Sequence, residues 1–293
     1  MNLLAGLDEI VKENEPMAKH TWFKLGGSAR YFVEPRNEED LLDVTKRCHE
    51  NEVDILVLGR GSNLLVSDAG IDGVVVHLND EHFGNIEIKE NIVTAQAGVD
   101  MGNLIGACAR QGLRGLECMV GIPGSVGGNI KQNAGGAFGD IGSVAKEVHL
   151  MDRTGYKFTR EREEIYFGYR TTNIMAKFIV GAEFTLTPDD PEQIGRSIKE
   201  VWMFKKTTQP INTRNAGCVF KNPRAMSSGA LIDRAGLMNK SVGGAHVSDK
   251  HANFIVANSG ATSKDVQDLI QLIRKTVNDK FGVELELEIQ IWP

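Results

Sequence analysis

The sequence lacks the features that mark several classes of protein. Its four cysteines, Cys48, Cys108, Cys118 and Cys218, lie far apart and form no CxxC pair, so neither a zinc site nor a structural disulfide is expected. Acidic residues outnumber basic ones by 39 to 33, giving a net charge of −6. A chain without a general basic field is not expected to bind nucleic acid. We therefore expect no metal ion and no nucleic-acid partner.

A long apolar run is also missing from the N-terminal segment. Asp8, Glu9 and Lys12 interrupt the stretch MNLLAGLDEIVKENEPM, which therefore predicts neither a signal peptide nor a membrane-spanning helix. We expect a cytoplasmic protein that does not insert into a membrane, and a monomer. Its 293 residues, 41% of them apolar, suffice for two domains more readily than for one.

Helical and strand patterns alternate in the first part of the chain. Residues 38–50 have apolar positions at helical spacing and lead into the strand-like run DILVLG. Further strands are predicted in VVVHL, IEIKE, NIVTAQAG, EVHLM and KFIVGAEFTLTP. A helix is predicted from Asp100, its N-cap, to Gln111, with Gly112 at its end. The fold class is α+β, with a mixed α/β domain first.

A turn-rich break at Pro188 and Pro191 predicts a boundary between residues 1–190 and a smaller α+β domain, 191–293. The second part opens with a helix from about Glu192 to Lys206. Ser263 is predicted to cap a helix that ends at Gly282. Its apolar stripe is Val266, Leu269, Ile270, Ile273 and Val277. Strict alternation in residues 283–292 predicts a half-buried strand.

Glycine is abundant, with 32 residues, and two glycine-rich segments stand out, at 58–73 and 121–142. Neither contains the GK[ST] of a Walker loop or a GxGxxG that opens a helix. Either segment alone could be a set of tight turns at strand ends. Two such clusters in one domain favour backbone N–H groups that cradle phosphate.

Motifs in these two segments resemble those of a known protein family. The motifs G-R-G-S-N-L-L-V-S-D-x-G at 59–70, G-I-P-G-S-V-G-G at 121–128 and N-A-G-G at 133–136 resemble the FAD-binding (PCMH-type) domain of the vanillyl-alcohol oxidase type of flavoproteins. Within that superfamily, from T-W-F-K-L-G-G at 21–27 onward, the chain is similar to the UDP-N-acetylenolpyruvoylglucosamine reductases, also called UDP-N-acetylmuramate dehydrogenases. It resembles their shorter subtype, which lacks a tyrosine-bearing loop over the substrate.

The resemblance implies FAD as cofactor, NADPH as hydride donor, and reduction of UDP-N-acetylglucosamine enolpyruvate to UDP-N-acetylmuramate in peptidoglycan precursor synthesis. It implies an FAD-binding domain to about residue 190 and a C-terminal substrate domain. The implied FAD contacts are Gly59, Arg60, Gly61, Ser62, Asn63, Leu64, Gly121, Ile122, Pro123, Gly124, Ser125, Gly127, Gly128, Asn133, Ala134 and Gly135.

Reduction of an enolpyruvyl group requires a cation on its carboxylate and an acid for the neighbouring carbon. Arg170 offers a planar, bidentate donor, and it matches the family's Y-R-x-S/T motif, whose arginine stabilises the enolate-like intermediate. From the residues alone, a surface ion pair with Glu161, Glu163 or Glu164 is the more usual interpretation.

Two further catalytic candidates come from the register of the resemblance. Cys218, in N-A-G-C-V-F-K-N-P, stands where the family commonly has a serine, and a thiol is a stronger acid than an alcohol. The alternative is a buried structural cysteine. Glu288 matches the glutamate of the family's L-E-x-E-V/I ending, although the sequence pattern alone does not separate it from Glu284 and Glu286.

Contacts to the UDP-sugar are expected from both parts of the chain, and Asn253 is a further possible site residue. The predicted substrate contacts are Tyr169, Lys206, Asn222, Ser248 and His251. Two alternatives stay open: an FAD-linked oxidase of the same superfamily that acts on an alcohol, and a non-catalytic UDP-sugar binding protein.

Overall fold

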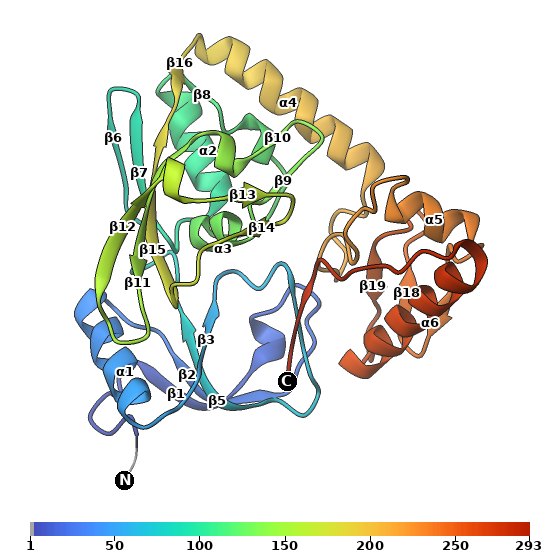
Figure 1. Ribbon diagram of the computed structural model, residues 1–293, viewed down its shortest axis with the longest axis horizontal. Helices are drawn as coiled ribbons and strands as arrows, with labels where there is room; N and C mark the ends of the chain where they lie inside the picture. Colours follow the sequence, from blue (N-terminus) through green and yellow to red (C-terminus); the bar gives the residue numbers. More distant parts are fainter. Residues whose placement is uncertain (1–2) are drawn as a thin grey trace. The chain divides into compact units, whose positions relative to one another are not determined.

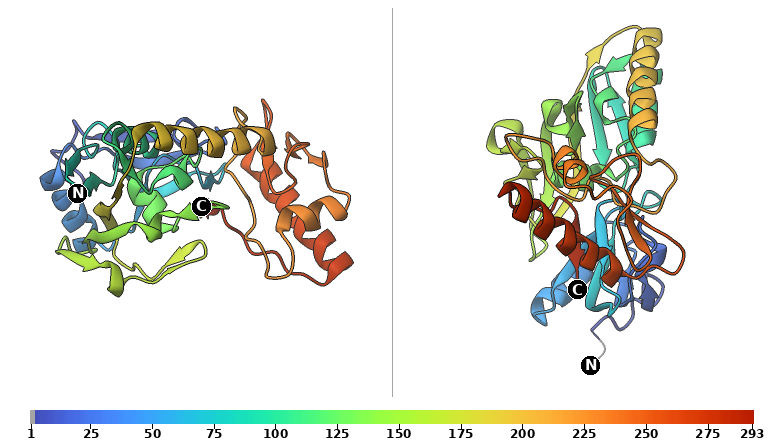
Figure 2. Two further views of the ribbon diagram at one scale, coloured as in Figure 1. Left: turned by 90° about the horizontal axis from the view of Figure 1, so that it is seen from above. Right: turned by 90° about the vertical axis from the view of Figure 1, so that its right-hand side faces the viewer.

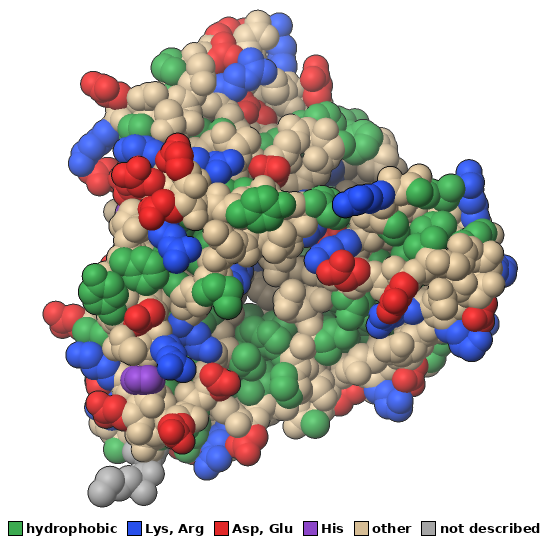
Figure 3. All heavy atoms as spheres, in the orientation of Figure 1, with side chains coloured by type: hydrophobic (Ala, Val, Ile, Leu, Met, Phe, Trp, Pro, Cys, Tyr) green, Lys and Arg blue, Asp and Glu red, His purple; other side chains and the backbone are tan. Residues whose placement is uncertain are grey.

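The computed structural model describes residues 3–293, which divide into two compact units. In this described part, the first unit holds residues 3–13, 31–60 and 73–205, and the second holds 14–30, 61–72 and 206–293. Each unit contains helices and strands, which confirms the predicted α+β class. Acidic and basic side chains are interspersed over the face seen in Figure 3. No helix in the described range reaches the length and apolarity needed to cross a bilayer.

The first unit begins with a helix and strand in the predicted order. In α1 (Glu38–Glu50) the N-cap Asn37 accepts a hydrogen bond from the backbone N–H of Asp40 at 2.9 Å. The helix leads into β3 (Ile55–Leu58), which pairs in parallel with β5 (Ile71–His77). With β1 (Val11–Pro16) and β2 (Ser28–Val33) these strands form a sheet in the order β1-β2-β5-β3.

A five-stranded antiparallel sheet in the order β12-β11-β15-β7-β6 forms the other layer of the first unit. Its strands are β6 (Ile86–Lys89), β7 (Ile92–Gln96), β11 (Ala145–Met151), β12 (Lys157–Glu161) and β15 (Phe178–Thr185). Figure 1 shows α2 (Met101–Arg110) and α3 (Val126–Lys131) on one face of this sheet. Val93, Ala95, Val148, Ala182 and Phe184 are fully buried on that face, so alternate strand residues form the core.

Short elements lie between these helices and strands along the chain. They are η1 (Met17–Lys19), β8 (Leu113–Arg114), η2 (Glu117–Met119), β9 (Gly135–Gly136), β10 (Gly139–Asp140), η3 (Ile141–Ser143), η4 (Arg162–Glu164), β13 (Phe167–Gly168), β14 (Thr171–Thr172) and β16 (Thr187–Pro188). The helix α4 (Pro191–Thr208) follows, two residues longer at its end than predicted, and is drawn in gold as one unbroken helix in Figure 2. The chain passes from the first unit to the second within α4, after Lys205.

The second unit is built around α6 (Ser263–Phe281), with α5 (Ser228–Arg234) and a sheet of β17 (Ser241–Val242), β18 (Ala245–Val247) and β19 (Ile255–Ala257). The predicted apolar stripe of α6 is confirmed, since all five of its members are at most 1% exposed. Gly282, at φ 66°, ends the helix as predicted. The N-cap is Thr262 and not the predicted Ser263, because the Thr262 hydroxyl accepts the N–H of Asp265 at 3.1 Å.

The predicted C-terminal strand is largely wrong. Only β20 (Gln290–Trp292) is a strand, and it pairs in parallel with β4 (Leu64–Val66). The preceding residues are extended and bond to a different segment, since the N–H of Lys221 donates to the Glu286 carbonyl at 2.8 Å. The change of partner interrupts the ladder, although Leu285 and Ile289 remain buried as the alternation requires.

Part of the first glycine-rich segment stabilises α6. The two carboxylate oxygens of Asp68 accept the N–H groups of Ser263 and Lys264 at 2.9 and 3.0 Å. These N–H groups belong to the first turn of the helix and have no partner within it. The negative charge of Asp68 also complements the positive end of the helix dipole.

We expect Asp68→Ala to lower the free energy of unfolding by about 1–2 kcal/mol, because two helix N–H groups lose a charged acceptor. Urea unfolding measures the loss. The control is Asp72→Ala, which removes an exposed ion pair to Arg30 and should change stability by less than about 1 kcal/mol. Equal losses in the two variants would contradict the capping role.

Candidate active site

The two glycine-rich loops meet in the first unit. A Cβ placed on Gly59 would lie 2.5 Å from the Oγ of Ser125, so only glycine allows the loops to approach this closely. Arg60 adds an ion pair at their junction, with its Nε 3.1 Å from a carboxylate oxygen of Asp100. The loops predicted to bind one cofactor are therefore neighbours.

The second loop contains a short helix, α3, which the sequence reading did not predict. The N–H of Gly127 donates to the Ala97 carbonyl at 2.9 Å and that of Gly128 to the Ser125 hydroxyl at 3.4 Å. These two glycines provide space but no N–H donor for a ligand. Within residues 3–293, the N–H groups of Gly121, Gly124 and Ser125 have no acceptor. Such unpaired donors fit the phosphate groups of FAD.

The first loop continues into the second unit, where its residues have a structural role. Gly61 has φ 61°, and a Cβ there would lie 2.0 Å from the carbonyl oxygen of His20. Asn63 donates from Nδ2 to the Glu288 carbonyl at 3.1 Å, and its own carbonyl accepts the N–H of Gln290 at 2.9 Å. Leu64 is buried in β4. This end of the loop thus fixes the C-terminal segment.

The N-A-G-G segment holds the hairpin that carries Arg170. Asn133 is buried and donates from Nδ2 to the Gly168 carbonyl at 2.9 Å. The N–H of Ala134 donates to the Asn129 carbonyl at 2.8 Å. The carbonyl of Gly135 accepts from Nη2 of Arg170 at 2.6 Å. A segment predicted to contact FAD therefore also positions the predicted catalytic arginine.

Arg170 lies in the two-residue turn between β13 and β14, where Gly168 pairs with Thr171. Its φ of 55° is in the left-handed region, which a large side chain rarely adopts. The guanidinium lies 5.3 Å from the ring centre of the neighbouring Tyr169, which is half exposed. Strained backbone of this kind is typical of functional positions.

In the second unit, Cys218 and Glu288 lie on adjacent extended segments. Cys218 forms an isolated β-bridge with Phe254, and the N–H of Glu288 donates to the carbonyl of Val219 at 2.8 Å. Glu288 is partly buried, whereas Glu284 and Glu286 are exposed. The burial therefore distinguishes the three glutamates, which the alternating sequence could not.

Asn253 fixes the backbone beside Cys218. Its amide donates to the Phe220 carbonyl at 2.7 Å and accepts the Phe220 N–H at 3.0 Å, and its side chain is buried. The ring of His251 accepts the Asn253 N–H at 3.2 Å. Burial lowers the pKa of His251, which favours a neutral ring at physiological pH.

The other predicted substrate contacts have internal roles in this structure. The Asn222 side chain accepts the N–H of Ser228 at the start of α5, at 3.0 Å. The buried Ser248 hydroxyl accepts the Lys250 N–H at 3.1 Å. Lys206 is exposed, and its carbonyl accepts from Nζ of Lys250 at 2.5 Å.

The sequence reading missed Lys205. This side chain is 5% exposed, and its Nζ donates to the Val120 carbonyl at 2.5 Å. The pKa of Lys205 is lowered to about 8, chiefly by burial. Cys118 acts in the opposite direction, and the charge of Arg170 contributes to the lowering. The signal was present, because Lys205 continues the helical stripe of Ile194 and Val201.

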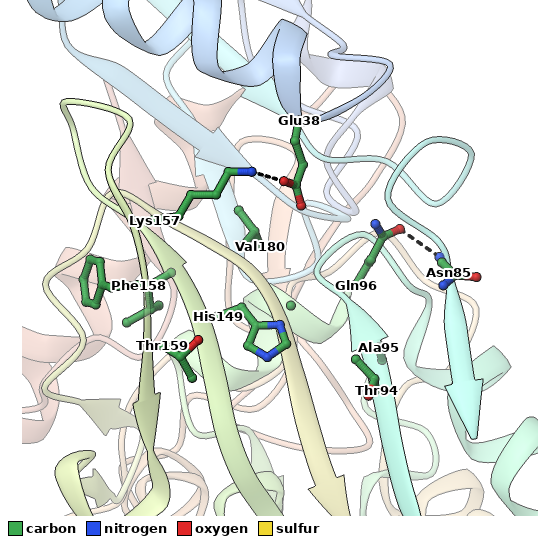
Figure 4. A pocket seen from close by; sticks show the side chains of 12 residues that line it. Glu38, Asn85, Thr94, Ala95, Gln96, His149, Lys157, Phe158, Thr159 and Val180 are labelled. Carbon is green, nitrogen blue, oxygen red and sulfur yellow. Dashed lines mark hydrogen bonds and ion pairs between the residues drawn. The ribbon is translucent and has the colours of Figure 1, made fainter. Parts of the chain in front are cut away.

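A separate hollow of about 470 Å³ lies on the outer face of the five-stranded sheet and is lined by none of the predicted site residues. Figure 4 shows His149 between Thr159 and Gln96 there. Gly181, which pairs with both His149 and Gln96, leaves the floor open. Beside it, Glu147, His149 and Glu183 lie close enough to share a cation. Each already has a partner, with His149 Nε2 2.9 Å from a Glu147 oxygen and Glu183 2.9 Å from Lys146.

Comparison with known proteins accounts for nearly the whole chain. The model of the UDP-N-acetylenolpyruvoylglucosamine reductase C-terminal domain matches residues 209–292, and the FAD binding domain model matches residues 29–159. A UDP-N-acetylenolpyruvoylglucosamine reductase of Clostridioides difficile (strain 630) is 40% identical over 294 residues, covering 99% of this chain and 96% of the relative.

Comparison with solved structures leads to the same family. The crystal structure of UDP-N-acetylenolpyruvylglucosamine reductase from Thermus caldophilus matches with a TM-score of 0.84 and 34% identity, covering 97% of this chain and 100% of that one. The glucose dehydrogenase Phl p 4.0202 matches 65% of this chain and 45% of its own, with a TM-score of 0.51 and 13% identity. The second match shows a shared fold alone.

Together with the two neighbouring glycine-rich loops, these matches show that the chain is a flavin-binding protein with a distinct C-terminal domain. The chain belongs to the UDP-N-acetylenolpyruvoylglucosamine reductase family. The predicted resemblance is confirmed.

The lowered pKa of Lys205 predicts a pH dependence of stability. Between the folded pKa of about 8 and the usual pKa of roughly 10.5, the unfolded chain binds the proton and the folded chain does not. Stability therefore rises with pH across this window, by up to about 3 kcal/mol, and the rise is absent below pH 8. Urea unfolding of the protein and of Lys205→Met, between pH 7 and 10.5, should show this difference.

Lys199→Met, which changes an exposed residue of the same helix, is the matched control and should follow the parent protein at every pH. A constant difference between the parent and Lys205→Met across the range would show that Lys205 is not buried as an amine.

Proposed function

We propose that this protein reduces UDP-N-acetylglucosamine enolpyruvate to UDP-N-acetylmuramate, with FAD as cofactor and NADPH as hydride donor. The observation that carries the proposal is a family relationship that covers 99% of the chain. The motif resemblance described above assigns the catalytic roles to Arg170, Cys218 and Glu288. The reaction belongs to peptidoglycan precursor synthesis. NADPH and nucleotide sugars support a cytoplasmic location, where we expect a monomer.

The glycine-rich loops are the proposed FAD site. The N–H groups of Gly121, Gly124 and Ser125 would donate to its phosphates. Gly59 and Gly61, whose missing side chains allow close packing against Ser125 and the His20 backbone, would hold the first loop in place beside them. FAD bound there would supply the hydride chemistry that links NADPH to the substrate, while the protein supplies orientation and electrostatics. We assign this role to residues 1–190 and substrate binding mainly to residues 191–293.

Arg170 is the proposed electrophilic residue. Hydride addition at the methylene carbon places negative charge on the adjacent carbon and its carboxylate, and a bidentate guanidinium stabilises this charge as it develops. The bond from Arg170 to the Gly135 carbonyl and the fixed turn support this role, because a preorganised cation needs little rearrangement during the reaction.

Cys218 is the proposed proton donor. Its thiol would give a proton to the carbon that carries the negative charge, becoming a thiolate that must regain a proton before the next turnover. Glu288, on the adjacent extended segment, is the proposed hydrogen-bonding partner near this carbon. Asn253 would position both through the backbone of Phe220.

The remaining proposed contacts bind the UDP-sugar. They are Tyr169, Lys206, Asn222, Ser248 and His251. The family relationship disfavours an FAD-linked alcohol oxidase and a non-catalytic UDP-sugar binding protein. An absorption spectrum recorded before and after NADPH, and then after the enolpyruvyl substrate, separates the three. The proposed reductase should show three properties together. It should be yellow, be bleached by NADPH, and be reoxidised by the enolpyruvyl substrate without oxygen.

We expect Cys218→Ala to lower turnover by roughly 10²- to 10⁴-fold, the usual contribution of a positioned acid. Bleaching of the bound flavin by NADPH should proceed at the parental rate, because this step does not use the thiol. Stopped-flow absorbance separates the two steps. Cys218→Ser is the matched control and should retain most of the turnover, and unchanged turnover in Cys218→Ala would remove Cys218 from the mechanism.

We expect Arg170→Lys to lower kcat by about 10²- to 10³-fold, because a lysine keeps the charge but loses the bidentate geometry. Steady-state kinetics measures kcat and KM separately. The control is Arg153→Lys at an exposed turn of the same unit, which should behave like the parent. A change in KM alone would assign Arg170 to ground-state binding.

A further inference from the structure

A buried ammonium group lies at the end of α4, outside all the roles assigned above. Lys205 is 5% exposed and donates to the Val120 carbonyl at 2.5 Å. An ammonium carries three N–H donors. In the described range, 3–293, it has no second acceptor and no carboxylate within ion-pair distance. Two of its donors therefore lack a partner, although buried donors are almost always paired.

The surroundings of Lys205 connect it to Arg170. The carbonyl that it binds belongs to Val120, at the end of η2. The same turn contains Cys118, whose Sγ would lie 3.6 Å from a Cβ placed on Gly139 of the β9–β10 hairpin. The other strand of that hairpin contains Gly135, which accepts from Arg170. Both cations are thus connected to one hairpin, Lys205 through the η2 turn and Arg170 through Gly135, and the charge of Arg170 reaches Lys205.

A second contact fixes α4 against this hairpin. Phe204, the residue before Lys205, packs edge to face on Phe138 at the hairpin tip, with ring centres 5.4 Å apart. Both rings are about half exposed. The helix end and the hairpin are therefore in direct contact, which holds Lys205 in place.

An apolar residue at position 205 would suit the helix better. Ile194 and Val201 precede it on the buried stripe, and burial of an ammonium without an anion is unfavourable. A charge retained at such a position, within electrostatic reach of the second cation Arg170, produces a local positive potential. A negatively charged ligand would satisfy both the potential and the two unpaired donors.

We infer that Lys205 binds the substrate carboxylate together with Arg170. This inference rests on the proposed function. A carboxylate is favoured over a cofactor phosphate for two reasons: the planar guanidinium of Arg170 matches two carboxylate oxygens, and the loop after Val120 already offers its own free N–H groups for phosphate. Lys205 would supply the second, point-like cation of the pair.

The test compares two ligands that differ in this carboxylate. Dissociation constants for UDP-N-acetylglucosamine enolpyruvate and for UDP-N-acetylglucosamine are measured from the change in flavin absorbance of the FAD-loaded protein. Lys205→Met should bind the enolpyruvyl ligand about 10- to 100-fold more weakly. Its affinity for UDP-N-acetylglucosamine should change less than about threefold, because that ligand shares the sugar and diphosphate but lacks the carboxylate.

Two further variants make the result decisive. Lys205→Gln can still donate to Val120 but is neutral, so it should show the same selective loss even if Lys205→Met folds poorly. Lys199→Met removes an exposed charge from the same helix and should bind both ligands like the parent.

Other outcomes overturn the inference. Equal weakening of both ligands would assign Lys205 to the diphosphate, loss of FAD would assign it to the cofactor, and unchanged binding would leave it a purely structural residue. If the parent protein itself does not bind the enolpyruvyl ligand, the proposed function fails instead, which distinguishes the two failures.

Discussion

Hydrogen bonds from buried asparagine side chains to the backbone determine where both groups of predicted catalytic residues lie. In the first unit, Asn133 joins the Gly168 carbonyl to the Gly142 N–H and so fixes the hairpin of Arg170. In the second, Asn253 pairs with both backbone groups of Phe220. An amide donates and accepts at once, so it can replace a missing strand partner. Irregular backbone is thereby kept in one conformation.

The same positions carry local free-energy costs. Arg170 adopts a left-handed φ of 55°, and Lys205 places an ammonium among apolar residues of α4. Neither feature helps the chain to fold, since the left-handed backbone is strained and the buried charge is poorly solvated. Departures from local preference at a few positions are typical of functional sites in otherwise consistent sequences. The connection of both residues to one hairpin is therefore an argument for function.

Regular elements with strong periodicity were predictable. The stripe of α6, the N-cap Asp100 and the strands β3, β5, β6, β7, β11 and β15 follow from side-chain pattern and local capping chemistry. The helix α3 was not, because glycines obscure helical periodicity and its N-cap Ser125 lies in a segment read as a phosphate cradle. The final strand failed for a different reason. Its alternation reflects burial, but residues 286–288 and 290–292 bond to different segments, and no local pattern encodes a change of partner.

Some of the site residues were likewise predictable from the sequence and others were not. Motif register proposed Arg170, Cys218 and Glu288, and partial burial now separates Glu288 from its exposed neighbours. Lys205 was missed because a lysine near a helix end is normally exposed. Only its place on the apolar stripe indicated burial, and the acceptor, Val120, lies 85 residues away in the sequence.

The backbone around position 218 explains why a cysteine can replace the usual serine there. Gly217 has φ 76°, and its N–H donates to the Asn215 side chain at 2.9 Å, while Val219 donates to the Asn253 carbonyl at 2.8 Å. Both neighbours of Cys218 are thus fixed by groups other than its own side chain. A hydroxyl or a thiol would leave the backbone at the same point and in the same direction. The exchange then alters the acidity and size of the proposed donor but not the backbone that carries it, so the fold can accept either residue.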